Sequence, residues 1–252
     1  MCDKNTYAVA GQRVCEILDD AKIPYVCYII PGERLAPAEW EVGSALMHFD
    51  PSCDMLLGVG SGVINDTCKV LSHAIGIPSA IVGTAPSMDG FASNSASMEV
   101  NNVKLTLYNA SPAFILLDTE ILAQAPERML WAGLGDMAAK YCSVCEWRIA
   151  NIVIGEYYCE EVADMMRVSL KKIMAAAPRL MSRDPDAVQP IAEGLVTAGL
   201  AMAYAQVSRP ASGLEHYFSH VWEMQALERG VPYDLHGIQV GVGTMLTFQV
   251  LS

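Results

Sequence analysis

The sequence predicts two halves of different fold class: an α/β half with a parallel sheet over residues 1–124 and an all-helical half over residues 125–252. In the first half, short apolar runs alternate with segments of helical periodicity, at the spacing of βαβ units. In the second half, long segments repeat apolar residues three and four apart and contain few clusters of β-branched residues. A cleft between two such halves is a common place for a cofactor and a substrate to meet.

The first half is expected to alternate between helix and strand and then to add two further strands. Apolar runs bounded by turn-forming residues mark the strands, and apolar residues at helical spacing mark the helices. In chain order we expect a helix at 11–21, a strand at 24–30, a helix at 39–49, a strand at 55–59, a helix from about residue 64, and strands at 79–82, 103–108 and 113–117.

The second half is expected to contain helices alone, because its long periodic segments are separated by prolines, which end helices. The expected helices cover residues 129–152, 160–176, 187–206, 214–228 and 235–251.

The composition argues against several classes of function. A formal net charge of −12 disfavours a nucleic-acid ligand or an anionic membrane surface. The chain is 52% hydrophobic, but its most apolar segment, 191–207, is interrupted by Glu193 and Gln206, which predicts a buried helix rather than a membrane span. No basic region followed by an apolar core opens the sequence, so we expect no secretory signal and a cytoplasmic protein.

The eight cysteines show neither the spacing of a disulfide framework nor that of a zinc site. Cys142 and Cys145 form a C-x-x-C inside an expected helix, but no second pair completes a set of four ligands. We therefore expect free thiols, as in a reducing compartment.

The segment from Gly58 to Thr67 reads Gly-Val-Gly-Ser-Gly-Val-Ile-Asn-Asp-Thr and lies between an expected strand and an expected helix. Glycines allow a tight turn and a close approach of backbone N–H groups to a phosphate, and the helix start adds partial positive charge. This arrangement is typical of a Rossmann-like nucleotide site, although such turns also occur as plain connections. The residues 83–93, rich in turn formers and hydroxyls, follow the next strand, where open α/β sheets bind ligands and where ordinary surface loops also occur.

Four polar residues of the helical half are candidates for chemistry. Asp136 lies in an otherwise apolar helix, His216 and His220 are four residues apart on one helix face, and His236 opens the last helix. One carboxylate and two imidazoles suit a divalent metal that keeps a position open for substrate. Spacing alone leaves the alternatives that Asp136 is a helix cap and that the histidines are core hydrogen-bond partners.

Five motifs occur in an order that resembles the sn-glycerol-1-phosphate dehydrogenase family, a group of metal-dependent alcohol dehydrogenases with a dehydroquinate-synthase-like fold. The resemblance covers most of the chain. The motifs are Gly60-Ser61-Gly62-Val63-Ile64-Asn65-Asp66-Thr67-x-Lys69, Thr84-Ala85-Pro86-Ser87-Met88-Asp89-Gly90, Gly135-Asp136-x-x-Ala139-Lys140, Ser212-Gly213-x-Glu215-His216 and His236-Gly237-x-Gln239-Val240-Gly241-x-Gly243-Thr244.

The resemblance implies roles for individual residues. Asp136, His216 and His236 would bind one divalent metal, with zinc expected and nickel or iron as alternatives. Asp89 and His220 would contact the substrate, with Asp136 and His220 as the catalytic pair. NAD or NADP would lie along the residues Gly62, Val63, Ile64, Asn65, Asp66, Thr84, Ala85, Pro86, Ser87 and Ser93.

The implied activity is that of a cytoplasmic oxidoreductase of phospholipid biosynthesis. It would interconvert dihydroxyacetone phosphate and sn-glycerol 1-phosphate by hydride transfer. The alternatives are a glycerol or polyol dehydrogenase of the same fold, a dehydroquinate-synthase-like lyase, and a non-catalytic remnant, because relative to the family both ends are expected to be truncated. The cofactor preference between NAD and NADP and a homo-oligomeric state stay open.

Overall fold

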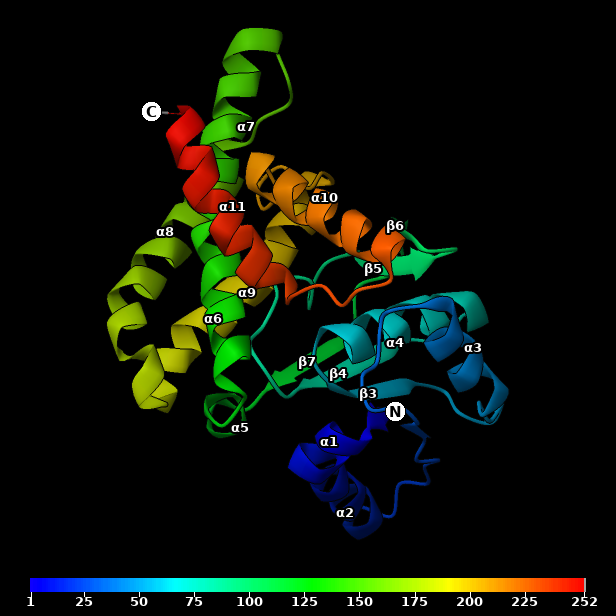
Figure 1. The fold of residues 1–252 in the computed structure, drawn as a ribbon. Helices are drawn as coiled ribbons and strands as arrows, with labels where there is room; N and C mark the ends of the chain where they lie inside the picture. Colours follow the sequence, from blue (N-terminus) through cyan, green and yellow to red (C-terminus); the bar gives the residue numbers. More distant parts are fainter. Residues whose placement is uncertain (252) are drawn as a thin grey trace.

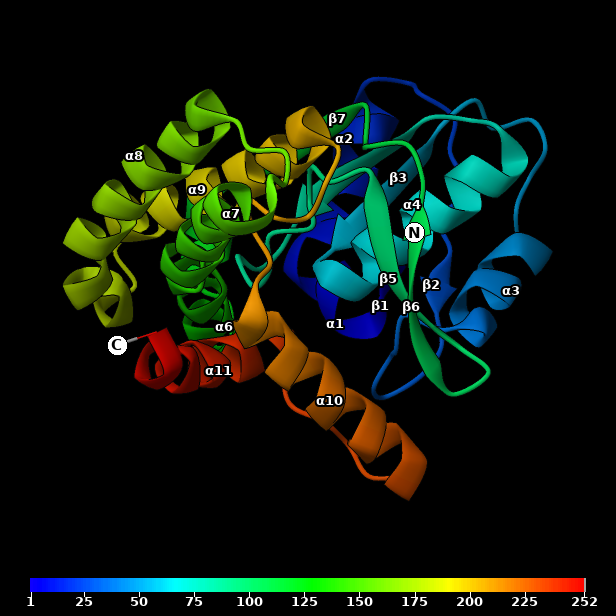
Figure 2. The same cartoon turned by 90° about the horizontal axis from the view of Figure 1, so that it is seen from above.

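The computed structural model describes residues 1–251, and within them every β-strand precedes residue 118 while eight α-helices or helical turns follow it. Figure 1 shows the strands and their helices on one side and the later helices on the other. Seen from above, the same two groups lie side by side, and the helix α10 (Leu214–Arg229) extends back along the strand β6 (Val103–Tyr108) (Figure 2).

The central sheet is parallel, as expected, with strand order β3-β4-β7. Its strands are β3 (Leu56–Gly60), β4 (Ser79–Gly83) and β7 (Phe114–Leu117). The helix α4 (Gly62–Ile75) connects β3 to β4 and ends at Gly76, which adopts φ +78°. Because β3 and β4 pair in parallel from Leu56↔Ser79 to Gly60↔Gly83, the segments that follow them meet at one sheet edge.

The first strands are shorter than expected. The chain begins with β1 (Cys2–Asp3), α1 (Lys4–Thr6), the π-helical turn η1 (Tyr7–Gly11) and α2 (Gln12–Asp20). The expected strand 24–30 is reduced to β2 (Ile29–Ile30), because only the two residues of β1 are available to pair with it.

An antiparallel hairpin lies between β4 and β7 in the chain, and the sequence predicted only its second strand. β6 has the expected bounds, but its partner β5 (Ser95–Val100) was not expected, because Ser-Ala-Ser-Met-Glu-Val contains few strand-forming residues. Asn101 and Asn102 connect the two strands with φ of +52° and +60°, as two-residue hairpin turns require. The helix α3 (Glu39–Met47) lies nearby, with Ala38 bridged to Glu99.

The second half is helical, as expected, with one correction. The expected helix 129–152 is two helices, α6 (Glu127–Ala138) and α7 (Lys140–Ile154), separated at Ala139. The Cys142 N–H donates to the Ala139 carbonyl over three residues instead of four, a tightening that is common where helices end. The other elements are α5 (Thr119–Ala123), α8 (Glu160–Ala176), the 3₁₀ helix η2 (Ala177–Ser182), α9 (Pro185–Ala205), α10 and α11 (His236–Leu251).

Glycines set the distance between α6 and its neighbours. A Cβ at Gly133 would overlap the carbonyl oxygen of Pro86, and a Cβ at Gly135 would overlap that of Gly237 in α11. The two glycines therefore allow α6 to approach both the loop after β4 and the start of α11. This close approach brings Asp136 of α6 next to both segments.

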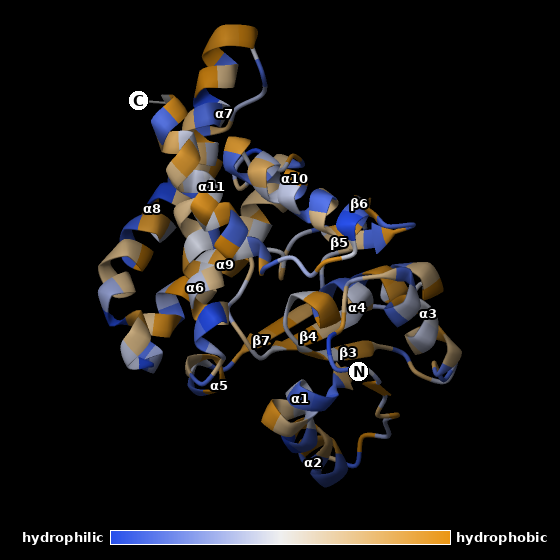
Figure 3. Cartoon of the chain, in the orientation of Figure 1, coloured by the Kyte–Doolittle hydropathy of each residue, from blue (hydrophilic) through white to orange (hydrophobic). Residues whose placement is uncertain are grey.

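Apolar side chains also remain on the surface, at the end of α7 and along α11 (Figure 3). Ile152, Val153 and Ile154 are exposed, as are Met245 and Phe248. Among residues 1–251, no helix is both long and apolar enough to cross a membrane. All eight cysteines lie within these residues and are free, as expected.

Replacing Gly133 by alanine should destabilise the fold, because the new methyl group would overlap backbone that cannot rotate away. We expect a loss of about 1–3 kcal/mol in the free energy of unfolding, the range for overpacking. Gly43→Ala is the matched control: Gly43 lies within α3 with no atom near its Cβ position, so alanine there should be neutral or stabilising. Urea unfolding of both variants measures the difference, and equal stabilities would contradict the packing argument.

Candidate metal and nucleotide site

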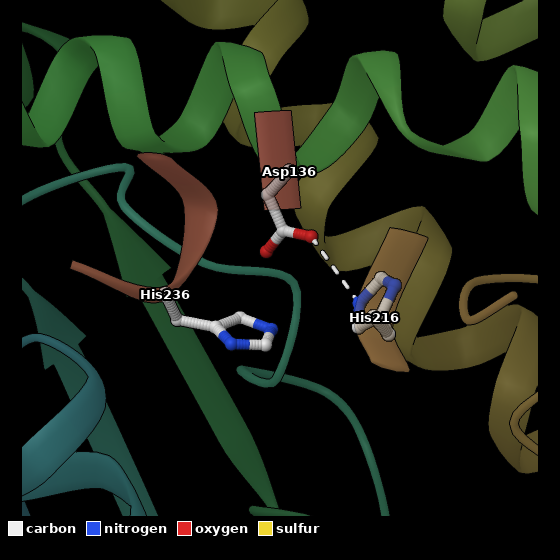
Figure 4. A group of neighbouring side chains, drawn as sticks. All are labelled: Asp136, His216 and His236. Carbon is white, nitrogen blue, oxygen red and sulfur yellow. Dashed lines mark ion pairs between the residues drawn. The ribbon is translucent and has the colours of Figure 1, made fainter. Parts of the chain in front are cut away.

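Asp136, His216 and His236 converge from three helices, α6, α10 and α11 (Figure 4). One ligand atom from each lies within 4.8 Å of the others, and Asp136 Oδ1 is 4.0 Å from His216 Nε2. Asp136 is fully buried, His216 is buried and the His236 side chain is 32% exposed. The structure therefore brings together the three residues that the sequence nominated as metal ligands.

This geometry fits a divalent cation. The 4.0 Å separation is too long for a hydrogen bond, but an ion about 2.0–2.2 Å from each atom would fit between them. A carboxylate and two imidazoles form a donor set suited to zinc and to related transition metals. Three protein ligands leave at least one coordination position for another molecule.

Each histidine is oriented by a carboxylate at its other ring nitrogen. His216 Nδ1 lies 2.9 Å from Glu215 Oε1, and Glu215 also accepts the Gly213 N–H at 2.7 Å. His236 Nδ1 lies 3.2 Å from Ser219 Oγ and 3.5 Å from Glu223 Oε1. With Nδ1 engaged in both rings, Nε2 is the nitrogen that remains for a metal, an arrangement typical of histidine ligands.

Glu223 is itself held by a cation from the other half of the chain. Its side chain is fully buried, and its Oε2 lies 3.1 Å from Lys104 Nζ on β6. Burial opposes ionisation, but the bond to His236 and the charge of Lys104 outweigh it and lower the pKa of Glu223 to about 2. Nothing in the sequence indicated that Glu223 and Lys104 belong to this site. Their contact spans a tertiary interface that no local spacing reveals.

Asp136 is surrounded by polar partners. Lys140 Nζ lies 2.8 Å from its Oδ1, and the Asp89 backbone N–H donates to its Oδ2 at 2.9 Å. Lys140 is fully buried and also pairs with Asp89 Oδ2 at 2.6 Å. Burial alone would lower the pKa of Lys140, but the two carboxylates raise it, so the ammonium stays charged. Asp89, nominated as a substrate contact, thus lies at the cluster, whereas Lys140, quoted in the same motif as Asp136, was given no role from the sequence.

His220 lies one turn after His216 on α10, and its ring centroid is 6.4 Å from that of His236. Burial, followed by the charge of His236, lowers its pKa, so the imidazole is mainly neutral at pH 7. His216 and His220 both line a cavity of about 310 Å³. The cavity places His220 beside the metal-ligand cluster with access to a bound molecule.

The glycine turn lies at the carboxyl edge of the central sheet. Ser61 precedes α4 but makes no side-chain cap, so the first N–H groups of this 14-residue helix lack that partner. Instead, Ser61 Oγ lies 2.6 Å from Ser87 Oγ, which follows the neighbouring strand β4. The two segments nominated for the nucleotide, 62–66 and 84–87, therefore meet at this edge.

Several of the nominated side chains point into the protein. Ile64 packs in the core between sheet and α4, and Asn65 Nδ2 donates to the Gly90 carbonyl. Asp66 accepts the Ser97 N–H, and Ser93 Oγ is bound by Lys69 Nζ. Gly62 and Val63 are half-buried, whereas Thr84, Ala85, Pro86 and Ser87 are buried. At the turn, the backbone N–H groups rather than these side chains remain for a phosphate.

Glu223→Gln should weaken metal binding without unfolding the chain. The amide keeps the shape but loses the charge that holds His236 Nδ1, and loss of such an outer partner reduces metal affinity about 10–100-fold. Chelator competition for Zn²⁺ measures the dissociation constant. Glu228→Gln, an exposed change on the same helix, is the control and should retain the original affinity. Equal affinities for all three proteins would exclude this orienting role.

Comparison with known proteins places these features in context. The sequence pattern of the iron-containing alcohol dehydrogenases matches residues 1–126. A protein named glycerol-1-phosphate dehydrogenase (NAD(P)+) from Halalkalibacterium halodurans is 35% identical over 249 residues, covering 98% of this chain and 62% of that protein. One of the same name from Methanosarcina mazei is 36% identical, over 96% of this chain and 66% of its own length. The chain thus spans less than two thirds of the length of these relatives.

Solved structures share the fold. Glycerol dehydrogenase from Schizosaccharomyces pombe superposes with a TM-score of 0.83 at 19% identity, covering all of this chain and 64% of that chain. Sulfoacetaldehyde reductase from Bifidobacterium kashiwanohense, solved with NAD+, superposes at 0.70 and 16% identity, covering all of this chain and 67% of that one. The dehydroquinate-synthase-like fold expected from the sequence is confirmed.

Proposed function

The chain belongs to the iron-containing alcohol dehydrogenase family, and on this basis we propose that it carries the nucleotide and metal sites of an NAD(P)-dependent sn-glycerol-1-phosphate dehydrogenase. The reaction interconverts dihydroxyacetone phosphate and sn-glycerol 1-phosphate by hydride transfer. The observation that carries the proposal is the convergence of Asp136, His216 and His236 beside a polar cavity. The names of the relatives at 35% and 36% identity support the substrate.

Asp136, His216 and His236 hold the divalent metal, with zinc proposed and nickel or iron as the alternatives. A bound ion would supply Lewis-acid chemistry to the oxygen on the substrate carbon that exchanges hydride. Glu215 and Glu223 keep the two imidazoles in place. Lys140 and the Asp89 backbone N–H hold the Asp136 carboxylate, and the Asp89 side chain, which pairs with Lys140, is assigned to substrate contact by the family motif.

The nucleotide binds along the carboxyl edge of the central sheet, as either NAD or NADP. The uncapped start of α4 at Gly62 provides N–H groups and partial positive charge for the pyrophosphate. The segment 84–87 lies beside this turn through the contact between the Ser61 and Ser87 hydroxyls, and we assign it to the adjoining part of the nucleotide. The Ser93 hydroxyl is bound by the buried Lys69 and does not face the nucleotide. Ser93 therefore acts on the nucleotide site through the shape of its loop.

His220 moves the proton that the substrate oxygen gains or loses. Its imidazole is mainly neutral, so it accepts a proton from an alcohol in the oxidation direction and returns one in the reverse direction. Its position on the cavity wall, one turn from His216, gives it access to a substrate bound there.

The deciding experiment is oxidation of NADH and NADPH by the metal-loaded chain, with dihydroxyacetone phosphate or dihydroxyacetone as substrate. Chelator-sensitive turnover of the phosphate ester alone is expected. Preference for the unphosphorylated ketone would instead favour a glycerol dehydrogenase, the activity named for the Schizosaccharomyces pombe protein. No turnover by folded, metal-loaded protein would indicate a non-catalytic chain, which spans 62% of the Halalkalibacterium halodurans relative.

His216→Ala and His220→Ala should separate metal binding from proton transfer. Removal of His216 takes away one of three ligands, so the purified variant should contain only trace metal by elemental analysis. Removal of His220 should leave the metal content intact and lower turnover about 100-fold, within the range for a lost general acid–base group. Full metal content in the first variant, or full turnover in the second, would contradict the corresponding role.

A further inference from the structure

The cavity beside the metal-ligand cluster is lined by groups that can donate hydrogen bonds. It occupies about 310 Å³ at the start of α10. No carboxylate is among its lining residues, although Glu156 pairs with the lining Arg209 and Glu146 accepts the Leu214 N–H next to the lining Gly213. The lining residues are Ser208, Arg209, Ser212, Gly213, His216, Tyr217 and His220. The lining offers a guanidinium, two serine hydroxyls and two imidazoles, which are groups that can donate hydrogen bonds to an anion.

Arg209 retains donors that its structural contact does not use. Its Nε and Nη2 donate to the two oxygens of Glu156 at 2.7 and 2.8 Å. These bonds occupy two of the five N–H groups of the guanidinium and fix its plane. Its side chain is one third exposed, so the remaining N–H groups are accessible to a phosphate, which arginine binds through paired hydrogen bonds.

The same cavity includes His216, whose Nε2 faces Asp136, and His220. A molecule in the cavity can therefore present an anionic group to Arg209 and a different group to the metal-ligand cluster. Ser208 and Ser212 add hydroxyl donors on the segment between α9 and α10.

The other large cavity is a poorer anion site. It measures about 530 Å³ and also contains two arginines, Arg34 and Arg128. Arg128 is paired with both oxygens of Asp234 at 2.6 Å, and Arg34 donates to the Tyr233 carbonyl. Asp234 itself lines this cavity, and its negative charge would repel a dianion.

We infer that Arg209, with Ser208 and Ser212, forms the subsite that binds the phosphate of a phosphorylated three-carbon substrate and distinguishes it from the free ketone. This inference rests on the proposed function, because it assigns one end of the same substrate. Arg209 is the binding residue here, and Glu156, which is not among the lining residues, accepts two of its five N–H groups and leaves the others for the phosphate.

The test separates phosphate binding from the Arg209–Glu156 ion pair. Arg209→Ala removes the donor, whereas Glu156→Gln weakens the ion pair and leaves the guanidinium present. Arg148→Ala, an exposed arginine on α7, is the charge-matched control. For each protein, the ratio of kcat/KM for dihydroxyacetone phosphate to that for dihydroxyacetone is measured, and calorimetry gives the Kd of inorganic phosphate.

Arg209→Ala should lower the preference for the phosphate ester about 10–100-fold and raise the Kd of inorganic phosphate by a similar factor, as expected when hydrogen bonds to a charged group are lost. Glu156→Gln and Arg148→Ala should retain the preference. An equal loss in Arg209→Ala and Glu156→Gln would mean that the ion pair only shapes the segment, and would overturn the inference.

Calorimetry distinguishes failure of this inference from failure of the proposed function. If the unmodified chain turns over neither ketone but binds inorganic phosphate, and Arg209→Ala abolishes that binding, the subsite stands and the dehydrogenase function does not. If the chain turns over the phosphate ester and Arg209→Ala keeps both the preference and the phosphate Kd, the function stands and the subsite is wrong.

Discussion

The buried carboxylate of Asp136 is the constraint on which the rest of the site depends. A carboxylate without solvent is costly unless cations and N–H donors surround it, and Lys140 and the Asp89 N–H supply these partners. Asp89 follows a strand of the α/β half, whereas Lys140 opens a helix of the other half. His216 and His236 approach from two further helices. All three residues lie in the helical half, so the docking of the two halves decides their outer partners, namely the Asp89 N–H at Asp136 and Lys104 at Glu223.

Two kinds of contact hold the α/β half against the helical half. Gly133 allows α6 to lie against Pro86 at the end of β4, at a separation that any side chain would prevent. Farther along the interface, Lys104 of the hairpin reaches the buried Glu223 of α10, which in turn orients His236. The first contact depends on close packing and the second on charge. Both link the α/β half to the cluster of Asp136, His216 and His236, so the position of the carboxyl edge of the sheet is coupled to the geometry of that cluster.

A second buried cation organises the loop between the two sites. Lys69 of α4 is fully buried and donates to the Gly90 and Ser95 carbonyls and to the Ser93 hydroxyl. Burial lowers its pKa, and the nearby Asp66 partly offsets that effect. These bonds fix the loop between Gly90 and Ser95 and so help to place the adjacent Asp89 at Asp136. The motif that begins at the glycine turn thus supports the cluster around Asp136 as well as the carboxyl edge of the sheet.

The sequence by itself determined the features that arise from local periodicity and turn chemistry. It determined the strand–glycine–helix unit around Gly62 and the helices that carry His216 and His236, and the family motifs nominated Asp136, His216 and His236, which the fold brings together. Tertiary structure decided what depends on contacts between distant segments. β2 was limited to two residues by its short partner, and β5 formed because β6 pairs with it despite weak strand propensity. Lys104 and Glu223 meet across 119 positions, and Lys140, which pairs locally with Asp136, gains its second carboxylate from the distant Asp89. Burial and charge pairing are properties of the folded interface, which is why no local pattern could specify them.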